Sequence, residues 1–296
     1  MSNGSYSIMN VSFLEAPICK GSPTDGSQYA FASLCRHGLA DRFNGAQFIP
    51  MSLHDVAEPE TDPRMKDLNA VMAVSTRLYQ SVGKALREGR FPIVIGGDHS
   101  VAIGSIAGTA SVCGAEALTV IYIDGHTDIH TEKTTETGFI HGMPLAAAMG
   151  LCHKALTVGA GVNLYGKNTV ILGARSIDDG EYPTLQAQGV TLYTAEEIHA
   201  RGMAAVLGEV LTALRTPHIH LSFDVDVMDG GVFPSTGYRM PDGLSFEEAE
   251  QALTAVLRTG RVISMDFVEY NPLLDVDGHD REAVFRLLSH LKTDIT

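Results

Sequence analysis

The sequence feature that most constrains the fold is a series of short apolar runs that alternate with helix-like segments. Runs such as Val-Ile-Tyr-Ile at 120–123 are apolar at every position. Strands that are buried on both faces have this pattern, which indicates a parallel sheet covered by helices. We expect strands at eight places: 7–14, 47–52, 92–95, 118–123, 169–172, 190–193, 218–223 and 262–267.

Helical patterns occupy the intervals between these runs. Ser245 followed by Glu248 is the signature of a capping box at the start of a helix. The alternating order predicts an α/β fold, and we expect residues 1–296 to form a single three-layer domain. Its mostly parallel central sheet would have about eight strands flanked by helices. The helices are expected at 65–90, 100–110, 195–199, 202–214, 245–259 and 280–291.

The charge balance limits the classes of partner. The chain has 21 basic and 35 acidic residues, a net charge of −14, and no dense Lys/Arg run. A nucleic-acid partner would need a basic face, so we expect none, whereas an acidic protein attracts metal ions and cationic substrates. No apolar run reaches the roughly 18–20 residues of a membrane span, so we expect no membrane partner. Scattered cysteines without a CxxC pair favour reduced thiols and a cytoplasmic location.

Polar residues that suit metal chemistry follow three of the expected strands. They are Gly-Gly-Asp-His-Ser at 96–100, Asp-Gly-His-Thr-Asp at 124–128 and Asp-Val-Asp at 224–226. Ligands of parallel sheets bind beyond the carboxyl ends of the strands, so these segments are expected to face one site. Alternate residues of an extended segment point the same way, which lets each segment present several side chains together.

Carboxylate oxygens and imidazole nitrogens together bind divalent first-row metals. A single Asp at a strand end is more simply explained as a helix cap, but six donors with two regular spacings are not. The set exceeds the needs of one ion, and four carboxylates would repel one another without cations. Two metals sharing bridging carboxylates, and a water activated between them, are therefore expected. The six donors are His99, Asp124, His126, Asp128, Asp224 and Asp226.

These blocks, in this order, resemble the signature blocks of the ureohydrolases, the family of arginases, agmatinases and guanidino-acid hydrolases. The resemblance includes Asp-Phe-Val-Glu-Tyr-Asn-Pro at 266–272 and covers most of the chain. The segment 124–129 and Gly-x-x-His-Gly at 138–142 look most like arginase. The resemblance implies two Mn²⁺ per chain, although the ligand types also admit Co²⁺, Ni²⁺ or Fe²⁺. It also implies a homo-oligomer, either a trimer or a hexamer.

The resemblance further implies a role for each site residue. One manganese would be bound by His99, Asp124, Asp128 and Asp224, and the other by Asp124, His126, Asp224 and Asp226. His141 would shuttle protons, and its ordinary titration range suits protonation of a leaving amine. Glu269 would pair with the guanidinium, and Asp128 would also be catalytic. The substrate would be bound by His130, Thr137, Asp178, Glu181, Thr236 and Glu269.

The chain departs from the arginase pattern where the substrate's amino-acid end would bind. His130 and Phe139 stand where arginases have Asn, and Thr137 replaces a serine. A phenylalanine side chain cannot donate a hydrogen bond to a carboxylate. The reaction class is therefore better defined than the substrate.

The leading interpretation is hydrolysis of L-arginine to L-ornithine and urea. The first alternative keeps this chemistry but acts on agmatine, a guanidino acid or a modified arginine. A second is a non-catalytic metal-binding or regulatory protein of the same fold. A third is a binuclear phosphoesterase, whose sites usually contain Asn and more His ligands.

Overall fold

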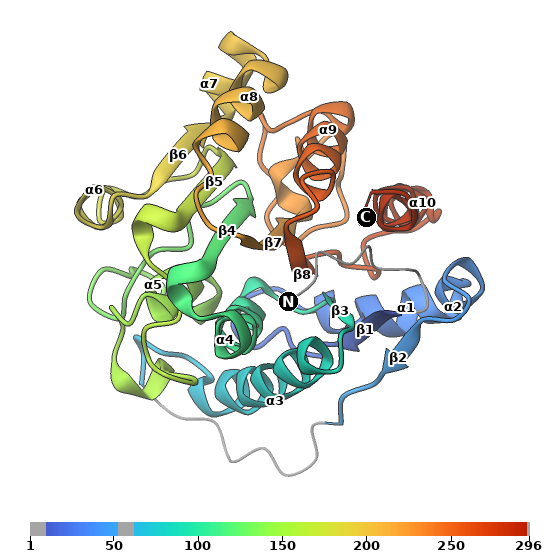
Figure 1. The fold of residues 1–296 in the computed structure, drawn as a ribbon, viewed down its shortest axis with the longest axis horizontal. Coiled ribbons are helices and arrows are strands. Elements are labelled where there is room, and N and C mark those ends of the chain that lie inside the picture. Colours follow the sequence, from blue (N-terminus) through green and yellow to red (C-terminus); the bar gives the residue numbers. More distant parts are fainter. Residues whose placement is uncertain (1–9, 53–61, 295–296) are drawn as a thin grey trace.

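A computed structural model of the protein describes residues 10–52 and 62–294, which form a sheet of eight strands between helices (Figure 1). The strand order is β2-β1-β3-β8-β7-β4-β5-β6, and every adjacent pair is parallel. This confirms the expected α/β class, and each predicted run overlaps one strand. Residues 7–9 of the first run lie outside the described residues. The strands are β1 (Val11–Glu15), β2 (Gln47–Ile49), β3 (Phe91–Ile95), β4 (Leu118–Ile123), β5 (Thr169–Ala174), β6 (Thr191–Thr194), β7 (His218–Asp224) and β8 (Val262–Val268).

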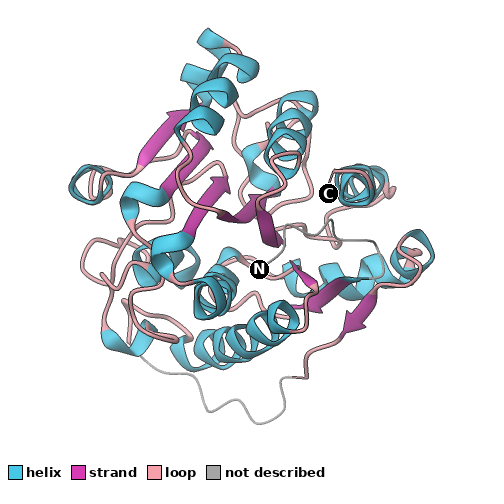
Figure 2. Ribbon diagram, in the orientation of Figure 1, coloured by secondary structure: helices cyan, strands magenta, loops and turns pink. Residues whose placement is uncertain are grey.

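Helices cover both faces of the sheet (Figure 2). α3 (Leu68–Arg87), α4 (Ala102–Cys113) and α5 (Pro144–Ala148) lie on one face in Figure 1. The opposite face carries α8 (Met203–Ala213), α9 (Phe246–Leu257) and α10 (His279–Ser289). The remaining helices are α1 (Ala30–Arg36), α2 (Leu39–Arg42), α6 (Tyr182–Gln188) and α7 (Ala195–Arg201).

The buried strands contribute side chains to both helical layers because successive residues of a strand point to opposite faces. On β3, Val94 packs in the apolar cluster with α3 and α4, whereas Ile93 and Ile95 pack in the cluster on the other face. This explains the continuous apolar runs in the sequence. At the start of α9, Ser245 and Glu248 form the expected capping box, each side chain accepting the other's backbone N–H.

The topology brings the predicted donors to one edge of the sheet. The four central strands, β3, β8, β7 and β4, are neighbours although they are far apart in sequence. Because all are parallel, their carboxyl ends and the following loops meet at the same edge, where parallel sheets bind ligands.

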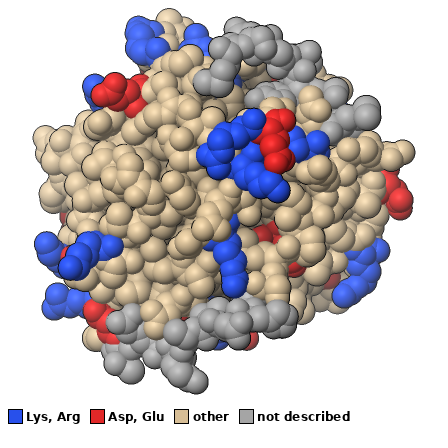
Figure 3. Space-filling model, turned by 60° about the horizontal axis from the view of Figure 1, so that its bottom comes forward, with Lys and Arg blue, Asp and Glu red and all other residues tan. Residues whose placement is uncertain are grey.

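The exterior of the molecule bears on two partner classes, membranes and nucleic acid. Within the described ranges, no helix combines the length and apolarity needed to cross a membrane. On the face shown in Figure 3, the Lys and Arg side chains form small separate groups, not a continuous basic surface. That face therefore lacks the broad basic field by which proteins bind nucleic acid.

Candidate metal centre and active site

The loop after β3 is shaped to present His99. Gly97 has a φ of +80°, and a Cβ there would lie 2.7 Å from a backbone carbonyl oxygen, so the turn requires glycine. Asp98 accepts hydrogen bonds from the backbone N–H of Ser100 at 3.0 Å and of Gly21 at 2.9 Å. Asp98 therefore caps the turn that carries His99 and anchors it to the loop after β1.

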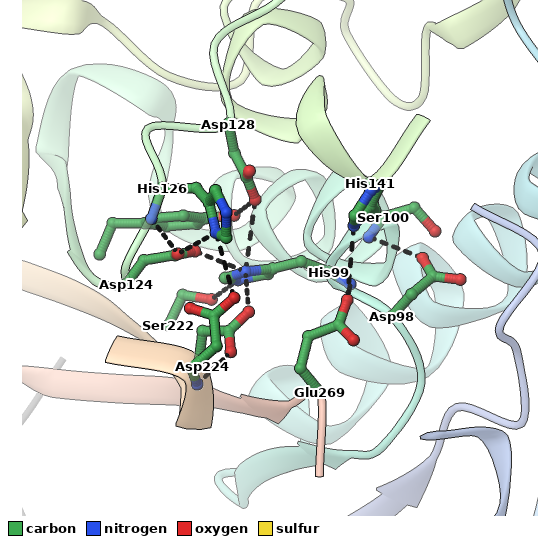
Figure 4. A network of polar contacts seen from close by, with 12 residues as sticks. Asp98, His99, Ser100, Asp124, His126, Asp128, His141, Ser222, Asp224 and Glu269 are labelled. Carbon is green, nitrogen blue, oxygen red and sulfur yellow. Dashed lines mark hydrogen bonds and ion pairs between the residues drawn. The ribbon is translucent and has the colours of Figure 1, made fainter. Parts of the chain in front are cut away.

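The two-residue spacing of the carboxylates has a local structural cause. Asp124 Oδ1 accepts a hydrogen bond from the His126 backbone N–H at 2.6 Å, and Asp224 Oδ1 accepts one from the Asp226 N–H at 2.7 Å. Asp226 Oδ1 in turn accepts from the Gly125 N–H at 3.1 Å. One oxygen of each carboxylate is thus fixed by the backbone. The other oxygens of Asp124 and Asp224 face His99 (Figure 4).

Four donors form what we call the inner group: His99, Asp124, Asp128 and Asp224. His99 Nδ1 lies 2.8 Å from Asp124 Oδ2 and 3.1 Å from Asp224 Oδ2. It also lies 3.4 Å from Asp128 Oδ2. All four residues are buried. The structure therefore brings together donors that follow three different strands.

A second set, which we call the outer group, comprises Asp124, His126 and Asp226. His126 Nδ1 lies 3.1 Å from Asp226 Oδ2 and 3.5 Å from Asp124 Oδ1. The His126 side chain is 23% exposed, and its ring meets the Tyr238 ring edge-on at 5.5 Å. The two groups share Asp124, and the partly exposed His126 places the outer group nearer to solvent than the buried inner group.

The electrostatics of this cluster fit bound cations. The buried His99 Nδ1 and Asp124 Oδ2 have no hydrogen-bond partner. Burial and the charge of Asp124 raise the pKa of Asp128 to about 7. Burial and the charges of Asp226 and Asp124 likewise raise the pKa of Asp224 well above its usual range. Burial lowers the pKa of His99 and His126, but the neighbouring carboxylates outweigh burial and raise both pKa values well above their usual range. The carboxylates therefore require positive charge among them, and the oxygen and nitrogen donors of the cluster suit divalent first-row metals.

A buried polar network supports His99 from behind, and sequence reasoning did not identify it. His99 Nε2 lies 2.7 Å from Ser222 Oγ, which donates to Asp266 Oδ2 at 3.5 Å. Asp266 Oδ2 also accepts from Ser105 Oγ at 2.6 Å and lies 3.0 Å from His220 Nε2. When His99 Nε2 carries the ring proton and donates it in a hydrogen bond to Ser222 Oγ, the lone pair of Nδ1 faces the inner group. Metal binding requires this arrangement. The position of Ser222, two residues before Asp224, was the available signal.

His141 and Glu269 form a pair beside the metal donors. His141 Nδ1 lies 3.6 Å from Glu269 Oε1, and Glu269 is buried beneath it (Figure 4). Glu269 Oε1 also accepts a hydrogen bond from the His99 backbone N–H at 3.0 Å. Burial favours neutral His141, but the Glu269 carboxylate outweighs this effect and raises the pKa of His141. The pair is therefore arranged to keep a proton on the imidazole.

Two of the site carboxylates lie on unusual backbone. Among the described residues, the non-glycine positions with positive φ include Asp128 at +48° and Glu269 at +63°. Side chains rarely adopt this left-handed conformation, which costs of order 1–3 kcal/mol and is concentrated at functional sites. The fold therefore holds both carboxylates against a local preference.

A pocket of about 270 Å³ opens above the donors. His126, Asp128 and His141 lie among the residues that line it. Its other lining residues include the side chains of Phe139, Tyr238 and Met240, and the polar residues His130, Thr137, Asp178 and Glu181. We call the metal donors with His141 the floor, and His130, Thr137, Phe139 and Asp178 the rim.

Polar groups of the rim bind one another. His130 Nε2 lies 3.0 Å from Asp178 Oδ2, and its Nδ1 lies 3.1 Å from Thr134 Oγ1. Glu181 is buried and accepts the backbone N–H groups of Asp178 at 2.9 Å and Ile129 at 3.3 Å. Glu181 therefore joins two loops. His130 and Asp178, both expected to bind the substrate, are paired with each other.

The other rim residues have different surroundings. Thr137 Oγ1 accepts a hydrogen bond from the Phe139 N–H at 3.3 Å. The Phe139 ring meets the His141 ring edge-on at 6.3 Å, and Lys66 Nζ lies 4.0 Å from the Phe139 ring centroid. Thr236 is buried, and its hydroxyl has no hydrogen-bond partner. The structure thus places Thr137 and Phe139 at the pocket, whereas Thr236 is not among its lining residues.

Arg175, directly after β5, connects the floor to the pocket wall. Its guanidinium donates hydrogen bonds to backbone carbonyls of two segments. These bonds fix the loop that contains Asp226 relative to the segment that contains Met240, which lines the pocket. The five acceptors are the carbonyls of Asp226, Val227, Met228, Met240 and Pro241.

A parallel sheet with carboxylates and histidines gathered at its central strand ends, beside a histidine–glutamate pair, is the architecture of a metal-dependent α/β hydrolase. Residues 10–292 match the model of the Arginase family. The chain belongs to this family, whose arginases are binuclear-metal-dependent hydrolases that act on C–N bonds of linear amidines. It is an enzyme of that class.

Two relatives illustrate the similarity. The chain is 35% identical to the arginase of Bacillus subtilis (strain 168) over 293 residues, which cover 95% of this chain and 97% of the relative. It is 33% identical to arginase-1 of Oryctolagus cuniculus, with 95% and 89% covered. The crystal structure of the Bacillus subtilis arginase superposes with a TM-score of 0.88 at 34% identity, covering 96% and 98% of the chains.

Proposed function

We propose that the chain hydrolyses L-arginine to L-ornithine and urea. The observation that carries the proposal is the pair of donor groups that share Asp124, beside His141, on the floor of one pocket. The two groups would each bind one Mn²⁺, with the ligand sets expected from the sequence. When bound, the cations would supply a water nucleophile near neutral pH.

The chain's own residues then act on the substrate. The water oxygen adds to the guanidinium carbon, and the bond from that carbon to the δ-nitrogen of ornithine breaks. Asp128, which lines the floor of the pocket, would accept the water proton. His141, kept protonated by Glu269, donates a proton to the leaving amine. Both contacts of Glu269 use Oε1, which leaves Oε2 for the guanidinium.

A urea-release assay tests the proposal. The metal-free protein is reconstituted with Mn²⁺ and supplied with L-arginine, agmatine and 4-guanidinobutyrate, with the metal-free protein as control. Urea should form only after reconstitution. If the protein binds metal but releases urea from none of these compounds, the proposed activity is wrong, and the alternatives are a modified guanidino substrate or a non-catalytic role.

A second candidate substrate is a guanidinoalkyl amine such as agmatine, which has no α-carboxylate. The pairing of His130 with Asp178 favours it, because His130 Nε2 is already occupied. Phe139 offers no side-chain donor in place of the lost amide. Asp178 retains a second oxygen that suits the terminal ammonium of such a substrate. The homo-oligomeric assembly and cytoplasmic location expected from the sequence stay predictions.

A further inference from the structure

Tyr122 is a buried side chain that the proposed chemistry does not use. It lies on β4, two residues before Asp124, and has no exposed surface. Its ring is parallel to the His99 ring, with centroids 4.3 Å apart and an interplanar angle of 8°. Its hydroxyl donates a hydrogen bond of 2.7 Å to Asp128 Oδ2. One side chain therefore contacts two donors of the inner group.

The Asp128 carboxylate is oriented differently from the other three carboxylates of the cluster. Each of those accepts a backbone N–H, whereas Asp128 accepts its hydrogen bond from the Tyr122 side chain. The bonded oxygen, Oδ2, is also the one that lies 3.4 Å from His99 Nδ1. The hydroxyl thus fixes the oxygen that faces the centre of the inner group.

Packing alone does not require a hydroxyl at this position. Tyr122 belongs to an apolar cluster that includes Ile106, Leu145 and Ile171, where phenylalanine would fill nearly the same volume. Burying a hydroxyl without a partner costs about 1–3 kcal/mol, so its presence here is explained by its acceptor. The acceptor is a metal-donor carboxylate, which points to a role in the metal centre.

We propose that Tyr122 is a positioning residue that holds His99 and Asp128 in the orientation in which the inner group binds a divalent cation. The ring stack limits rotation of the His99 imidazole. The hydrogen bond limits rotation of the Asp128 carboxylate, whose backbone conformation is itself unfavourable. Tyr122 acts only through these two donors, since it does not line the pocket.

Titration of the metal-free Tyr122→Phe variant with Mn²⁺ tests this role, with free Mn²⁺ measured by its EPR signal. Two cations should still bind at saturation. One dissociation constant should rise by about 10–100-fold, the usual effect of losing a partner that orients a metal ligand, and the other by less than about threefold. The matched control is Tyr193→Phe on β6, which removes a 3.1 Å phenol–carboxylate contact with Glu209 on α8. It should change neither constant.

Unchanged constants in Tyr122→Phe would overturn the proposal. So would a metal-free variant that fails to fold by circular dichroism, because the hydroxyl would then be a structural requirement. Tyr122→Leu removes the ring as well and should weaken the same binding step further. Equal affinities in the Phe and Leu variants would refute the part assigned to the stack. The titration needs no turnover, so failure of the proposed substrate leaves this result interpretable.

Discussion

Three of the four carboxylates on the floor of the pocket have one oxygen fixed by a backbone N–H. The rim is held instead by side chains that bind one another, as His130 binds Asp178. The floor donors are mostly buried, whereas the Asp178 side chain is 59% exposed. The backbone therefore orients most of the floor carboxylates, whereas the arrangement of the rim depends on which side chains are present there.

This difference separates reaction from substrate. Changing a floor carboxylate removes a donor that the backbone was shaped to orient, and nearby residues cannot replace it. Changing a rim residue alters only which groups are available to the far end of a substrate. The same hydrolytic floor can thus serve different guanidino compounds, and the following variants test how independent the two regions are.

The largest effect is expected from Asp124→Ala, because Asp124 belongs to both donor groups. Urea release should fall to background, and metal content should drop from about two ions per chain. Elemental analysis of the Mn²⁺-loaded variant measures this. Asp179→Ala, at an exposed carboxylate beside the rim, is the control and should retain both metals. Full metal occupancy in Asp124→Ala would contradict its bridging role.

A large effect on turnover alone is expected from His141→Ala. Loss of a general acid should lower kcat by roughly 10–10⁴-fold, while metal content stays unchanged, because His141 contacts Glu269 and not the donor groups. Steady-state kinetics and metal analysis of the same preparation measure the two quantities. Loss of metal in this variant would make His141 a metal ligand or a structural residue of the metal centre.

A moderate and selective effect is expected at the rim. Replacing His130 and Phe139 together by Asn frees Asp178 and supplies two amides to an α-carboxylate. The ratio of kcat/KM for L-arginine to that for agmatine should rise roughly tenfold to 150-fold. This corresponds to the free energy of about 1.5–3 kcal/mol that a hydrogen bond to a charged group contributes. Metal content should not change. A ratio that falls would mean that His130 already binds the carboxylate of arginine.

The smallest effect is expected from Lys66→Met. Lys66 lies over the Phe139 ring but is not among the residues that line the pocket. A cation–π contact near the surface contributes about 0.5–1 kcal/mol, so kcat/KM should change by less than about fivefold for every substrate. A larger loss confined to anionic substrates would show that Lys66 binds their carboxylate and belongs to the rim.

The sequence predicted the eight strands and the class of fold because buried parallel strands leave a local, continuous apolar pattern. It also predicted which donors would be close, since they follow neighbouring strands at alternating positions. It did not predict α1, α2, α5 and α6, each with at most seven residues. Helices this short show too little periodicity to be distinguished from loops.

Contacts between segments that are distant in sequence could not be predicted either. The pairing of His130 with Asp178 joins residues 48 positions apart, and its consequence for the rim appears only in three dimensions. Tyr122 was treated as one apolar residue of a strand, although its hydroxyl reaches Asp128. The place of Asp98 beside His99 in the sequence does not define its role either, and only its contacts with Ser100 and Gly21 identify it as the cap of the turn.

The left-handed backbone at Asp128 and Glu269 has a consequence for how this lineage changes over time. A side chain in that conformation costs about 1–2 kcal/mol that glycine avoids, so selection for stability alone pulls both positions towards glycine. Only the continued demand for a carboxylate opposes this pull. In descendants released from that demand, these two sites should be among the first to drift, and glycine there would mark a chain that has kept its fold and abandoned its chemistry.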